Sequence, residues 1–370
     1  MLPPLDIPAL ERYVSVHVPT IKPPIKLEPF AGGQSNPTYR LEDRNGAKFV
    51  LRKKPPGNIV SSASHQVERE YRAMHALRTS NVPVPEVFCL CEDSSVIGTP
   101  FYIMEFLDGR IFKEAFIPGV SPAERTEMWR QAVYTLAKLH RVNPRAVAFT
   151  MGKPTGYYDR QITTLQALSS SYAVTPDAET NQPVGELPKM EEMISFFKNK
   201  EIRPQHRSCI VHGDYKIDNL VFHRTEPRVI GVLDWELCTL GHPLSDLSGV
   251  LLNWTVTNGP GEVRTHSNPA FLTGNTAYPG LPSKEQCVAW YRELSGWDPA
   301  PEMQWSDAFG VFRTGVQIQG IAARYAARQA RDIEAKMIGE NCFPYAEMAW
   351  KVVCGYKEVR EKANSVHSHL

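Results

Sequence analysis

The sequence divides into a first part made of short strand-like runs and a longer second part with helical periodicity. Before Gly109 the runs contain β-branched and aromatic residues, and Asn45-Gly46 between two of them is a typical hairpin turn. The strands are predicted at residues 36–41, 48–53, 86–91 and 100–106. Strands gathered before helices predict an α+β fold.

One helix interrupts the strands, and its inward face carries a carboxylate. Between Ser64 and Arg78 one stripe at helical spacing consists of Val67, Glu70, Ala73, Met74 and Leu77. A buried carboxylate is costly unless it is paired, so Glu70 is expected to face a cation.

A capping box marks the start of the helical part. Ser121-Pro122-Ala123-Glu124 supplies a capping hydroxyl, a proline at the first helical position and a glutamate three residues after the cap. The helix that follows should bury one face, formed by Met128, Ala132, Leu136 and Leu139. Further on, residues 169–188 are polar and lack periodicity, which predicts a long insertion.

Composition and charge are those of an ordinary globular chain. Hydrophobic residues make up 42% and charged residues 22% of the 370 residues, enough for two lobes that share a cleft. With 41 basic and 40 acidic side chains the net charge is +1, so no nucleic-acid or membrane partner is expected. No apolar run reaches membrane-spanning length, and seven scattered cysteines imply no disulfide framework.

The two ends of the chain bear on its location. Prolines at positions 3, 4, 8, 19, 23 and 24 are expected to prevent a signal-peptide core or an amphipathic presequence. The last three residues, Ser368-His369-Leu370, match the small, basic, Leu pattern of a peroxisomal address. The predicted location is therefore cytoplasmic, or peroxisomal if this tripeptide acts as a signal.

The most informative segment is His-Gly-Asp-Tyr-Lys-Ile-Asp-Asn at residues 212–219, and Asp234 follows fifteen residues after its end. Phosphoryl transfer from ATP needs a base on the attacking hydroxyl, oxygen ligands for Mg²⁺ and positive charge near the phosphates. Asp214 can act as the base, and Asn219 and Asp234 offer the hard oxygen ligands that Mg²⁺ prefers. Lys216 can reach the transferred phosphate.

This pattern, His-x-Asp-x-x-x-x-Asn followed by a strand and an Asp, resembles the catalytic and metal loops of protein kinases and of the aminoglycoside phosphotransferase and choline kinase superfamily. Gly213 and the Asp-Trp-Glu of residues 234–236 favour the small-molecule branch. The chain as a whole is similar to the kinase-like domain that precedes acyl-CoA dehydrogenase modules in some larger proteins. The motifs that carry this similarity are GGQSNPT at 32–38, VLRKKPPG at 50–57, SVIGT at 95–99, IPGVSPAER at 117–125 and GHPLSDL at 241–247.

The resemblance implies a protein-kinase-like fold with two lobes. Residues 1–107 would form the N-lobe, an antiparallel sheet with one main helix that binds the nucleotide. Residues 108–370 would form a mostly helical C-lobe that carries the catalytic and metal loops. ATP and Mg²⁺ are the implied cofactors.

Residues of the N-lobe receive roles by position in this resemblance. Gly33, Ser35 and Asn36 would belong to the turn over the nucleotide phosphates, and Val50 would cap the adenine. Arg52 would stand where kinases keep a phosphate-binding lysine, with Glu70 as the partner of the cation. Because Arg and Lys are not interchangeable, the neighbouring Lys53 remains a rival for this role.

The hinge and the loop supports follow in the same way. Backbone groups of Met104, Glu105 and Leu107 would read the adenine edge. His212 is expected to hold its loop by hydrogen bonds rather than to act as acid or base. Asp246 resembles a residue that braces the catalytic loop.

Two other classes of function stay open. A pseudokinase would keep the fold and bind nucleotide without turnover, although Asp214, Asn219 and Asp234 are all present. A His/Asp metal hydrolase could use His212 with the two aspartates, but more histidines at short spacing would be expected.

The acceptor is a small molecule with a hydroxyl group, and the resemblance suggests a hydroxyacyl-CoA. Arg324, Arg328 and Arg331 are predicted on one face of a helix near residues 318–334. They would form either a basic wall for an anionic acceptor or a solvated face. No acidic cluster suited to a polycationic aminoglycoside is evident in the second lobe.

Overall fold

The computed structural model describes residues 5–30, 36–55, 66–261, 263, 265–330 and 333–367. Its contacts divide the chain into two compact units. Unit 1 contains residues 1–113, 141–151 and 212–239, and unit 2 contains residues 114–140, 152–211 and 240–370. Unit 1 therefore holds both the sheet and the segment that carries the predicted catalytic and metal loops. The lobe boundary after residue 107 stays a prediction.

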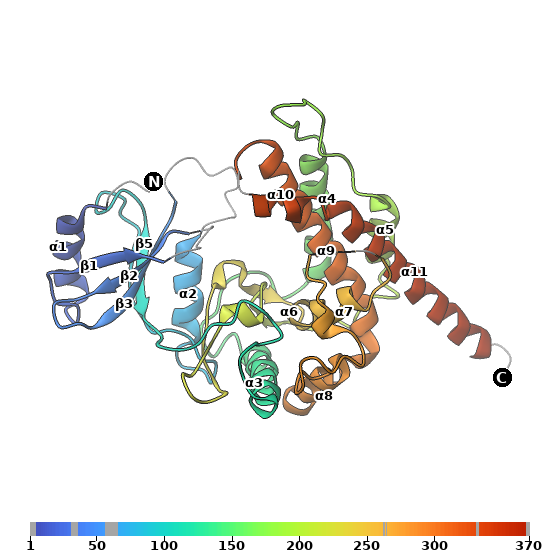
Figure 1. Cartoon of the computed structure of the whole chain (residues 1–370), viewed down its shortest axis with the longest axis horizontal. Helices are drawn as coiled ribbons and strands as arrows, with labels where there is room; N and C mark the ends of the chain where they lie inside the picture. Colours follow the sequence, from blue (N-terminus) through green and yellow to red (C-terminus); the bar gives the residue numbers. More distant parts are fainter. Residues whose placement is uncertain are drawn as a thin grey trace. The chain divides into compact units, whose positions relative to one another are not determined.

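Unit 1 is built on a five-stranded antiparallel sheet (Figure 1). Its strands are β1 (Lys26–Pro29), β2 (Thr38–Glu42), β3 (Lys48–Lys53), β4 (Val87–Cys91) and β5 (Phe101–Glu105), in the order β1-β2-β3-β5-β4. The four predicted strands are confirmed to within two residues at each end. The sequence reading did not include β1, an edge strand that ends at Pro29, a position where proline costs no ladder hydrogen bond.

The two faces of the sheet have different cover. On one face α1 (Ile7–His17) inserts Leu10 and Val14 into an apolar core with residues such as Leu51 and Ile103. This helix forms despite the prolines nearby, because Asp6 caps it and Pro8 lies in its first turn. On the other face lies α2 (Val67–Leu77) (Figure 1). The predicted buried stripe of α2 is confirmed, Glu70 included.

A short hairpin completes unit 1. Strands β7 (Leu220–Phe222) and β8 (Val229–Val232) pair antiparallel, between the 3₁₀ turns η1 (Ile217–Asn219) and η2 (Trp235–Leu237). Backbone hydrogen bonds of 2.7 and 2.9 Å join Arg110, just after the predicted hinge, to Phe222. The hairpin is thereby fixed to the segment that leaves the sheet.

Unit 2 is mostly helical. Its helices are α3 (Pro122–Arg141), α4 (Tyr157–Ala173), α5 (Met190–Lys198), α6 (Leu244–Val250), α7 (Leu252–Thr257), α8 (Lys284–Ser295), α9 (Ala300–Ala326), α10 (Ile333–Gly339) and α11 (Cys342–His367). A 3₁₀ turn, η3 (Pro269–Phe271), and a small sheet of β6 (Cys209–Val211) with β9 (Thr239–Gly241) complete the elements. The core lies around α9, where Trp305, Phe309 and Phe312 contact Phe197 edge to face or tilted.

The predicted start of α3, capped by the Ser121 hydroxyl with Pro122 as first helical residue, is confirmed. The backbone N–H of Glu124 donates to Oγ of Ser121 across 3.2 Å. The predicted inward face of the helix is fully buried, with Met128, Ala132, Leu136 and Leu139 at 0% exposure.

Three expectations about unit 2 were wrong. Helix α4 continues to Ala173, so the insertion begins later than residue 169. Within the helix, the Ser169 hydroxyl donates to Oε1 of buried Gln319 at 2.7 Å. Frequent prolines and glycines between residues 253 and 301 predict a loop-rich region, but α8 forms within it. The helix expected through residue 334 ends at Ala326, and Arg328 has a left-handed backbone with φ of 58°.

The early end of α9 also bears on the basic wall predicted from Arg324, Arg328 and Arg331. Arg328 makes ion pairs of 3.0 Å each with Asp177 and Glu179 of the insertion, so its charge is already balanced. Arg331 lies outside the described residues. A solvated, paired arginine is favoured over an anion-binding wall at this place.

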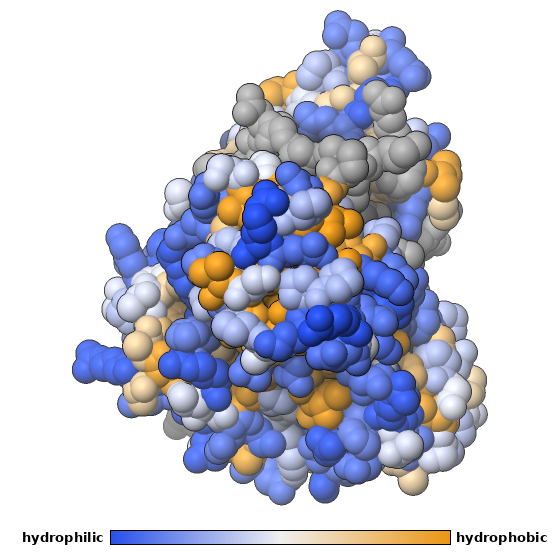
Figure 2. Space-filling model, turned by 90° about the vertical axis from the view of Figure 1, so that its left-hand side faces the viewer, coloured by the Kyte–Doolittle hydropathy of each residue, from blue (hydrophilic) through white to orange (hydrophobic). Residues whose placement is uncertain are grey.

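The described part of the face drawn in Figure 2 is mostly hydrophilic. In Figure 2 small apolar patches are scattered among polar side chains on the described part of the face shown. Throughout the described ranges, every helix is too short or too polar to cross a bilayer.

Candidate active site

The loop from His212 to Asn219 is held by its histidine. The His212 ring is buried, and its Nε2 lies 2.8 Å from the carbonyl oxygen of Leu233, while Nδ1 accepts from the backbone N–H of Asp214 at 3.2 Å. A ring that accepts at Nδ1 and donates at Nε2 is neutral. The prediction that His212 holds the loop by hydrogen bonds is confirmed, and the bonds tie the predicted catalytic loop to the residue before Asp234.

Gly213 is required by the shape of the same loop. Its φ is 90°, and an added Cβ would lie 2.7 Å from both Cβ and the carbonyl oxygen of Leu237. A side chain at this position would therefore meet backbone strain and a close neighbour together.

Asp214, Lys216 and Asn219 converge on one side of the loop. Nζ of Lys216 lies 3.3 Å from Oδ2 of Asp214 and 3.4 Å from Oδ2 of Asp218. Nδ2 of Asn219 donates to the Asp214 backbone carbonyl at 2.9 Å and contacts its carboxylate at 3.3 Å. The Asp214 side chain is 42% exposed, so its carboxylate is accessible from solvent.

Burial opposes the charge of Lys216, but the two aspartates outweigh burial and raise its pKa. Burial raises the pKa of the Asp218 carboxyl group, and the positive charge of Lys216 acts against this shift. The lysine therefore carries its charge at neutral pH, beside the residue predicted to be the base.

Asp234 sits in a tight turn after β8. Its backbone is left-handed, with φ of 68° and ψ of 57°. The following Trp235 is buried and donates from Nε1 to the carbonyl oxygen of Val232 across 2.8 Å, which anchors the turn. Aspartate is among the few residues besides glycine that adopt this conformation readily.

Arg52 lies between two carboxylates. Its Nη2 donates to Oδ1 of Asp234 at 2.7 Å, and its Nε lies 3.1 Å from Oε1 of Glu70. The prediction that Glu70 pairs with a cation is confirmed, and the cation is Arg52. Lys53 projects from the opposite face of β3, where burial lowers its pKa.

Glu70 is one of the most enclosed charged groups of unit 1, with 1% of its side chain exposed. Besides Arg52, Nδ2 of Asn36 donates to its Oε1 at 3.0 Å, and the hydroxyl of Tyr102 donates to its Oε2 at 3.0 Å. Burial raises the pKa of Glu70 to about 7, while Arg52 and the Tyr102 hydroxyl act against that shift.

A group of three carboxylates surrounds this arginine. Glu70, Asp234 and Glu236 each have a ligand oxygen within 4.8 Å of those of the other two. Oε2 of Glu236 is buried and has no hydrogen-bond partner, and burial followed by the charge of Asp234 raises the pKa of Glu236. Oxygen ligands alone suit Mg²⁺ rather than a transition metal. It is the only such group found among the described residues, and it contains no histidine, which disfavours the metal hydrolase.

The backbone segments that carry Asn219 and Asp234, the predicted metal ligands, lie next to each other. The N–H of Leu233 donates to the carbonyl oxygen of Asn219 across 2.9 Å, so the two loops run side by side. A shared magnesium site at Asn219 and Asp234 stays a prediction, and the carboxylates grouped with Asp234 are Glu70 and Glu236.

Only some of the residues predicted to bind the nucleotide lie within the described ranges. Gly33 and Ser35 lie outside the described residues. Val50 is buried on β3 opposite Met104, with Arg52 two residues further along the same face. Glu105 and Leu107 follow at the exit from β5, where Leu107 packs against Gly231 of β8.

Sequence reasoning missed the role of Tyr102. Tyr102 and Arg52 are direct cross-strand partners on β5 and β3, so both side chains project toward α2. Strand alternation placed each residue on a face, but the register between the two strands could not be read from the sequence. The side chain of Asn36 contacts Glu70, a contact that the sequence did not predict, and its place in the phosphate turn stays a prediction.

Asp246 has a partner inside unit 2. Its Oδ2 lies 3.2 Å from Nε2 of buried His140, whose Nδ1 lies 2.8 Å from the hydroxyl of Tyr291. Its role as a brace of the catalytic loop stays a prediction.

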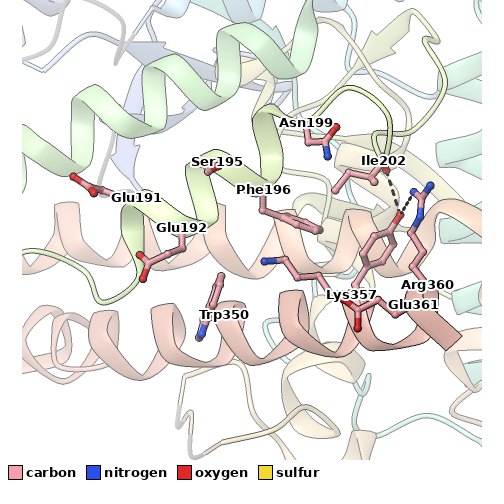
Figure 3. Close-up of a pocket in the computed structure, with 11 residues that line it drawn as sticks. Glu191, Glu192, Ser195, Phe196, Asn199, Ile202, Trp350, Lys357, Arg360 and Glu361 are labelled. Carbon is pink, nitrogen blue, oxygen red and sulfur yellow. Dashed lines mark hydrogen bonds between the residues drawn. The ribbon is translucent and has the colours of Figure 1, made fainter. Parts of the chain in front are cut away.

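A groove of about 710 Å³ lies between α5 and α11 of unit 2 (Figure 3). The Lys357 side chain reaches between the rings of Phe196 and Trp350, 5.6 and 4.9 Å from their centroids. None of the predicted site residues lines this groove.

Together, the sheet, the buried glutamate–arginine pair and the two loops define a kinase-like phosphotransferase fold with two lobes. The family model described as the phosphotransferase enzyme family matches residues 26–280, and the chain belongs to this family.

Solved structures give the same assignment. A crystal structure from Ralstonia eutropha, assigned to the aminoglycoside phosphotransferases, matches with a TM-score of 0.80 and 34% identity, and covers 95% of this chain and 99% of that one. An ethanolamine kinase of Plasmodium vivax shares the fold, with a TM-score of 0.58, 12% identity and coverage of 92% and 86%.

The curated relatives are longer proteins. Acyl-CoA dehydrogenase family member 10 of Mus musculus is 37% identical over 346 residues, which are 92% of this chain and 30% of that protein. Family member 11 of Rattus norvegicus is 34% identical over 348 residues, with 92% and 42% covered. The chain thus spans less than half the length of these relatives.

Proposed function

We propose that this protein transfers the γ-phosphate of ATP to a hydroxyl group of a small molecule, with Mg²⁺ as cofactor. The observation that carries the proposal is the position of Arg52 between Glu70 and Asp234, in the same unit as Asp214 and Asn219. This combination provides a cation for phosphate, oxygen ligands for a metal and an exposed carboxylate for a hydroxyl proton.

In the proposed reaction Asp214 accepts the proton of the substrate hydroxyl. The oxygen of that hydroxyl forms a bond to the γ-phosphorus, and the bond from phosphorus to the β-phosphate oxygen breaks, which releases ADP. Lys216 lies 3.3 Å from the Asp214 carboxylate and provides positive charge at the transferred group. Asn219 holds the Asp214 carboxylate in place through Nδ2.

Asn219 and Asp234 would hold the magnesium ion. When bound, the ion would neutralise phosphate charge. Arg52 would turn its guanidinium to the nucleotide phosphates, for which its bidentate fork is suited. Gly33 and Ser35 remain proposed phosphate-turn residues.

The adenine would bind at the exit from β5. Backbone groups of Met104, Glu105 and Leu107 would read its edge, and Val50 would cover its face. Val50 and Met104 are buried neighbours across β3 and β5, which supports an apolar slot at this place.

We propose a hydroxyacyl-CoA as the acceptor class. The names of the relatives include an acyl-CoA dehydrogenase, which supports a shared acyl-CoA ligand. A peroxisomal location through residues 368–370, which lie outside the described ranges, would be compatible with this substrate. A cytoplasmic location is the alternative.

A screen of hydroxyl-bearing metabolites for ATP consumption tests the proposal, with Asp214→Ala as control. We expect Mg²⁺-dependent turnover with 4-hydroxyacyl-CoA and loss of turnover in the variant with nucleotide binding retained. Turnover with choline or a sugar, and none with 4-hydroxyacyl-CoA, would remove the acyl-CoA assignment. Nucleotide binding without turnover on any acceptor would favour the pseudokinase.

A further inference from the structure

The carboxylate of Glu70 has more partners than an ion pair with Arg52 requires. Three groups meet it: Nε of Arg52 forms an ion pair with Oε1 at 3.1 Å, Nδ2 of Asn36 donates to Oε1, and the hydroxyl of Tyr102 donates to Oε2. They come from three places in the sequence, namely β3, the segment before β2, and β5. Each side chain except that of Arg52 has about 1% exposure or less.

These contacts fix the orientation of the carboxylate. A carboxylate that has only one partner can rotate about its last torsion, since terminal sp³–sp² torsions are broad. Donors on both oxygens remove that freedom. Arg52 has a partner at each end, so the direction of its fork depends on where Glu70 presents Oε1.

Tyr102 is placed for this task by the sheet. It is the direct cross-strand neighbour of Arg52 on β5, so both residues rise from the same face toward α2. Burial beside Glu70 keeps the pKa of Tyr102 well above its ordinary value, so the hydroxyl remains a donor at every pH of interest. Packing alone would be served equally by phenylalanine.

We infer that Tyr102 and Asn36 are positioning residues for phosphoryl transfer, which hold Glu70 so that Arg52 points its guanidinium at the nucleotide phosphates. The inference rests on the proposed function, because Arg52 is taken as the phosphate-binding cation. It adds two residues whose effect on ATP is transmitted through Glu70.

Tyr102→Phe tests the inference, because it removes one hydroxyl and keeps the buried ring. Tyr39→Phe is the matched control. Tyr39 lies in the same sheet, is 7% exposed and packs in the core on the α1 side. We expect Tyr102→Phe to raise KM for ATP and to lower kcat/KM by about tenfold, the cost of one hydrogen bond to a charged group. The control should leave both parameters within twofold, which is about the resolution of such assays.

A merely structural role predicts a different result. Loss of folded protein lowers the apparent kcat through a lower active concentration and leaves KM for ATP unchanged. If Tyr102→Phe and Tyr39→Phe lower kcat equally, with KM unaffected, the inference is wrong.

A double-mutant cycle shows whether the effect passes through Glu70. Glu70→Gln removes the charge that holds Arg52, so adding Tyr102→Phe to it should change kcat/KM for ATP by less than about twofold. An undiminished tenfold effect in that background would overturn the inference. Asn36→Ser, which removes the donor at the other oxygen, provides a second variant if Tyr102→Phe does not fold.

Nucleotide affinity separates this inference from the proposed function. If no acceptor supports turnover, the proposed function fails, yet the dissociation constant of a fluorescent ATP analogue can still be measured. Weaker binding in Tyr102→Phe and Asn36→Ser, and unchanged binding in Tyr39→Phe, would support the positioning role. Equal affinities in all three would contradict it.

Discussion

Arg52 donates from Nη2 to Oδ1 of Asp234 across 2.7 Å, although the two residues are 182 positions apart in the chain. Asp234 is the proposed metal ligand at the end of β8, and Arg52 is the proposed phosphate-binding cation on β3. In this structure the guanidinium therefore neutralises the carboxylate that a metal ion would need.

This contact predicts competition between the arginine and a metal ion. Arg52→Gln leaves Glu70, Asp234 and Glu236 without their cation, so the variant should bind Mn²⁺ in the absence of nucleotide at least about tenfold more tightly. Removing a unit charge a few ångström away is worth on the order of 1 to 4 kcal/mol. A Mn²⁺ titration followed by electron paramagnetic resonance measures the affinity. Arg69→Gln is the control, because Arg69 lies on α2 and donates to the Cys238 carbonyl instead.

The same geometry predicts that lysine cannot replace this arginine. Nε and Nη2 of Arg52 serve two different carboxylates, and a lysine ammonium is a single point of charge. Arg52→Lys should lower kcat/KM for ATP by roughly ten- to hundredfold, the cost of one charge-assisted hydrogen bond. Initial rates at varied ATP provide the measurement. Full activity in this variant would show that one contact is enough.

Two neighbouring carboxylates allow a paired test of the catalytic base. Asp214 and Asp218 both lie within 3.4 Å of Nζ of Lys216, but only Asp214 also contacts Nδ2 of Asn219. Asp214→Asn should lower kcat by roughly 10² to 10⁴, as expected for loss of a general base. Asp218→Asn should change kcat far less. Equal losses would assign the effect to the charge around Lys216 rather than to proton transfer.

The local part of this site could be predicted from the sequence. The spacing of Asp214, Asn219 and Asp234 is set within one short segment, and helical periodicity alone turned Glu70 inward. Both signals are local, because they depend on turns and on the helix repeat.

The contacts between distant segments could not be predicted in the same way. Alternation along β3 left Arg52 and Lys53 as rivals, and only packing against α2 distinguishes them. The partnership of Tyr102 with Glu70 depends on strand register, which a single sequence does not specify. The helix α9 ends at Ala326, and Arg328 beyond it pairs with Asp177 and Glu179, which are about 150 residues away in the chain and invisible to local periodicity.

Gly213 allows a stability prediction with an internal control. Gly213→Ala would place a Cβ 2.7 Å from Leu237 at a φ of 90°, so it should lower the free energy of unfolding by about 2 to 4 kcal/mol. Gly46→Ala has a similar φ of 80° but no neighbouring atom within 4 Å, so it should cost only about 1 kcal/mol. Urea denaturation measures both. If the two variants lose equal stability, the close approach to Leu237 contributes nothing.

His242 predicts how stability depends on pH. Burial lowers its pKa to about 4, and the ring is neutral: Nε2 donates to the Gln205 carbonyl at 2.9 Å, and Nδ1 accepts from the N–H of Leu244 at 3.3 Å. Protonation would direct an Nδ1–H at the Leu244 N–H. An unfolded chain binds this proton near pH 6.5 and the folded chain does not, so the stabilisation is complete above pH 6.5 and is lost as pH falls toward 4.

The total effect of that histidine is roughly 3 kcal/mol over this range, because each pKa unit corresponds to about 1.4 kcal/mol. His242→Gln keeps one donor and one acceptor but does not titrate, so its unfolding free energy should fall less steeply between pH 6.5 and 4. Urea denaturation at a series of pH values measures these slopes. Glutamine at this position gains no proton on unfolding. If the unfolding free energy of His242→Gln still falls as steeply as that of the original protein, other groups cause the acid sensitivity.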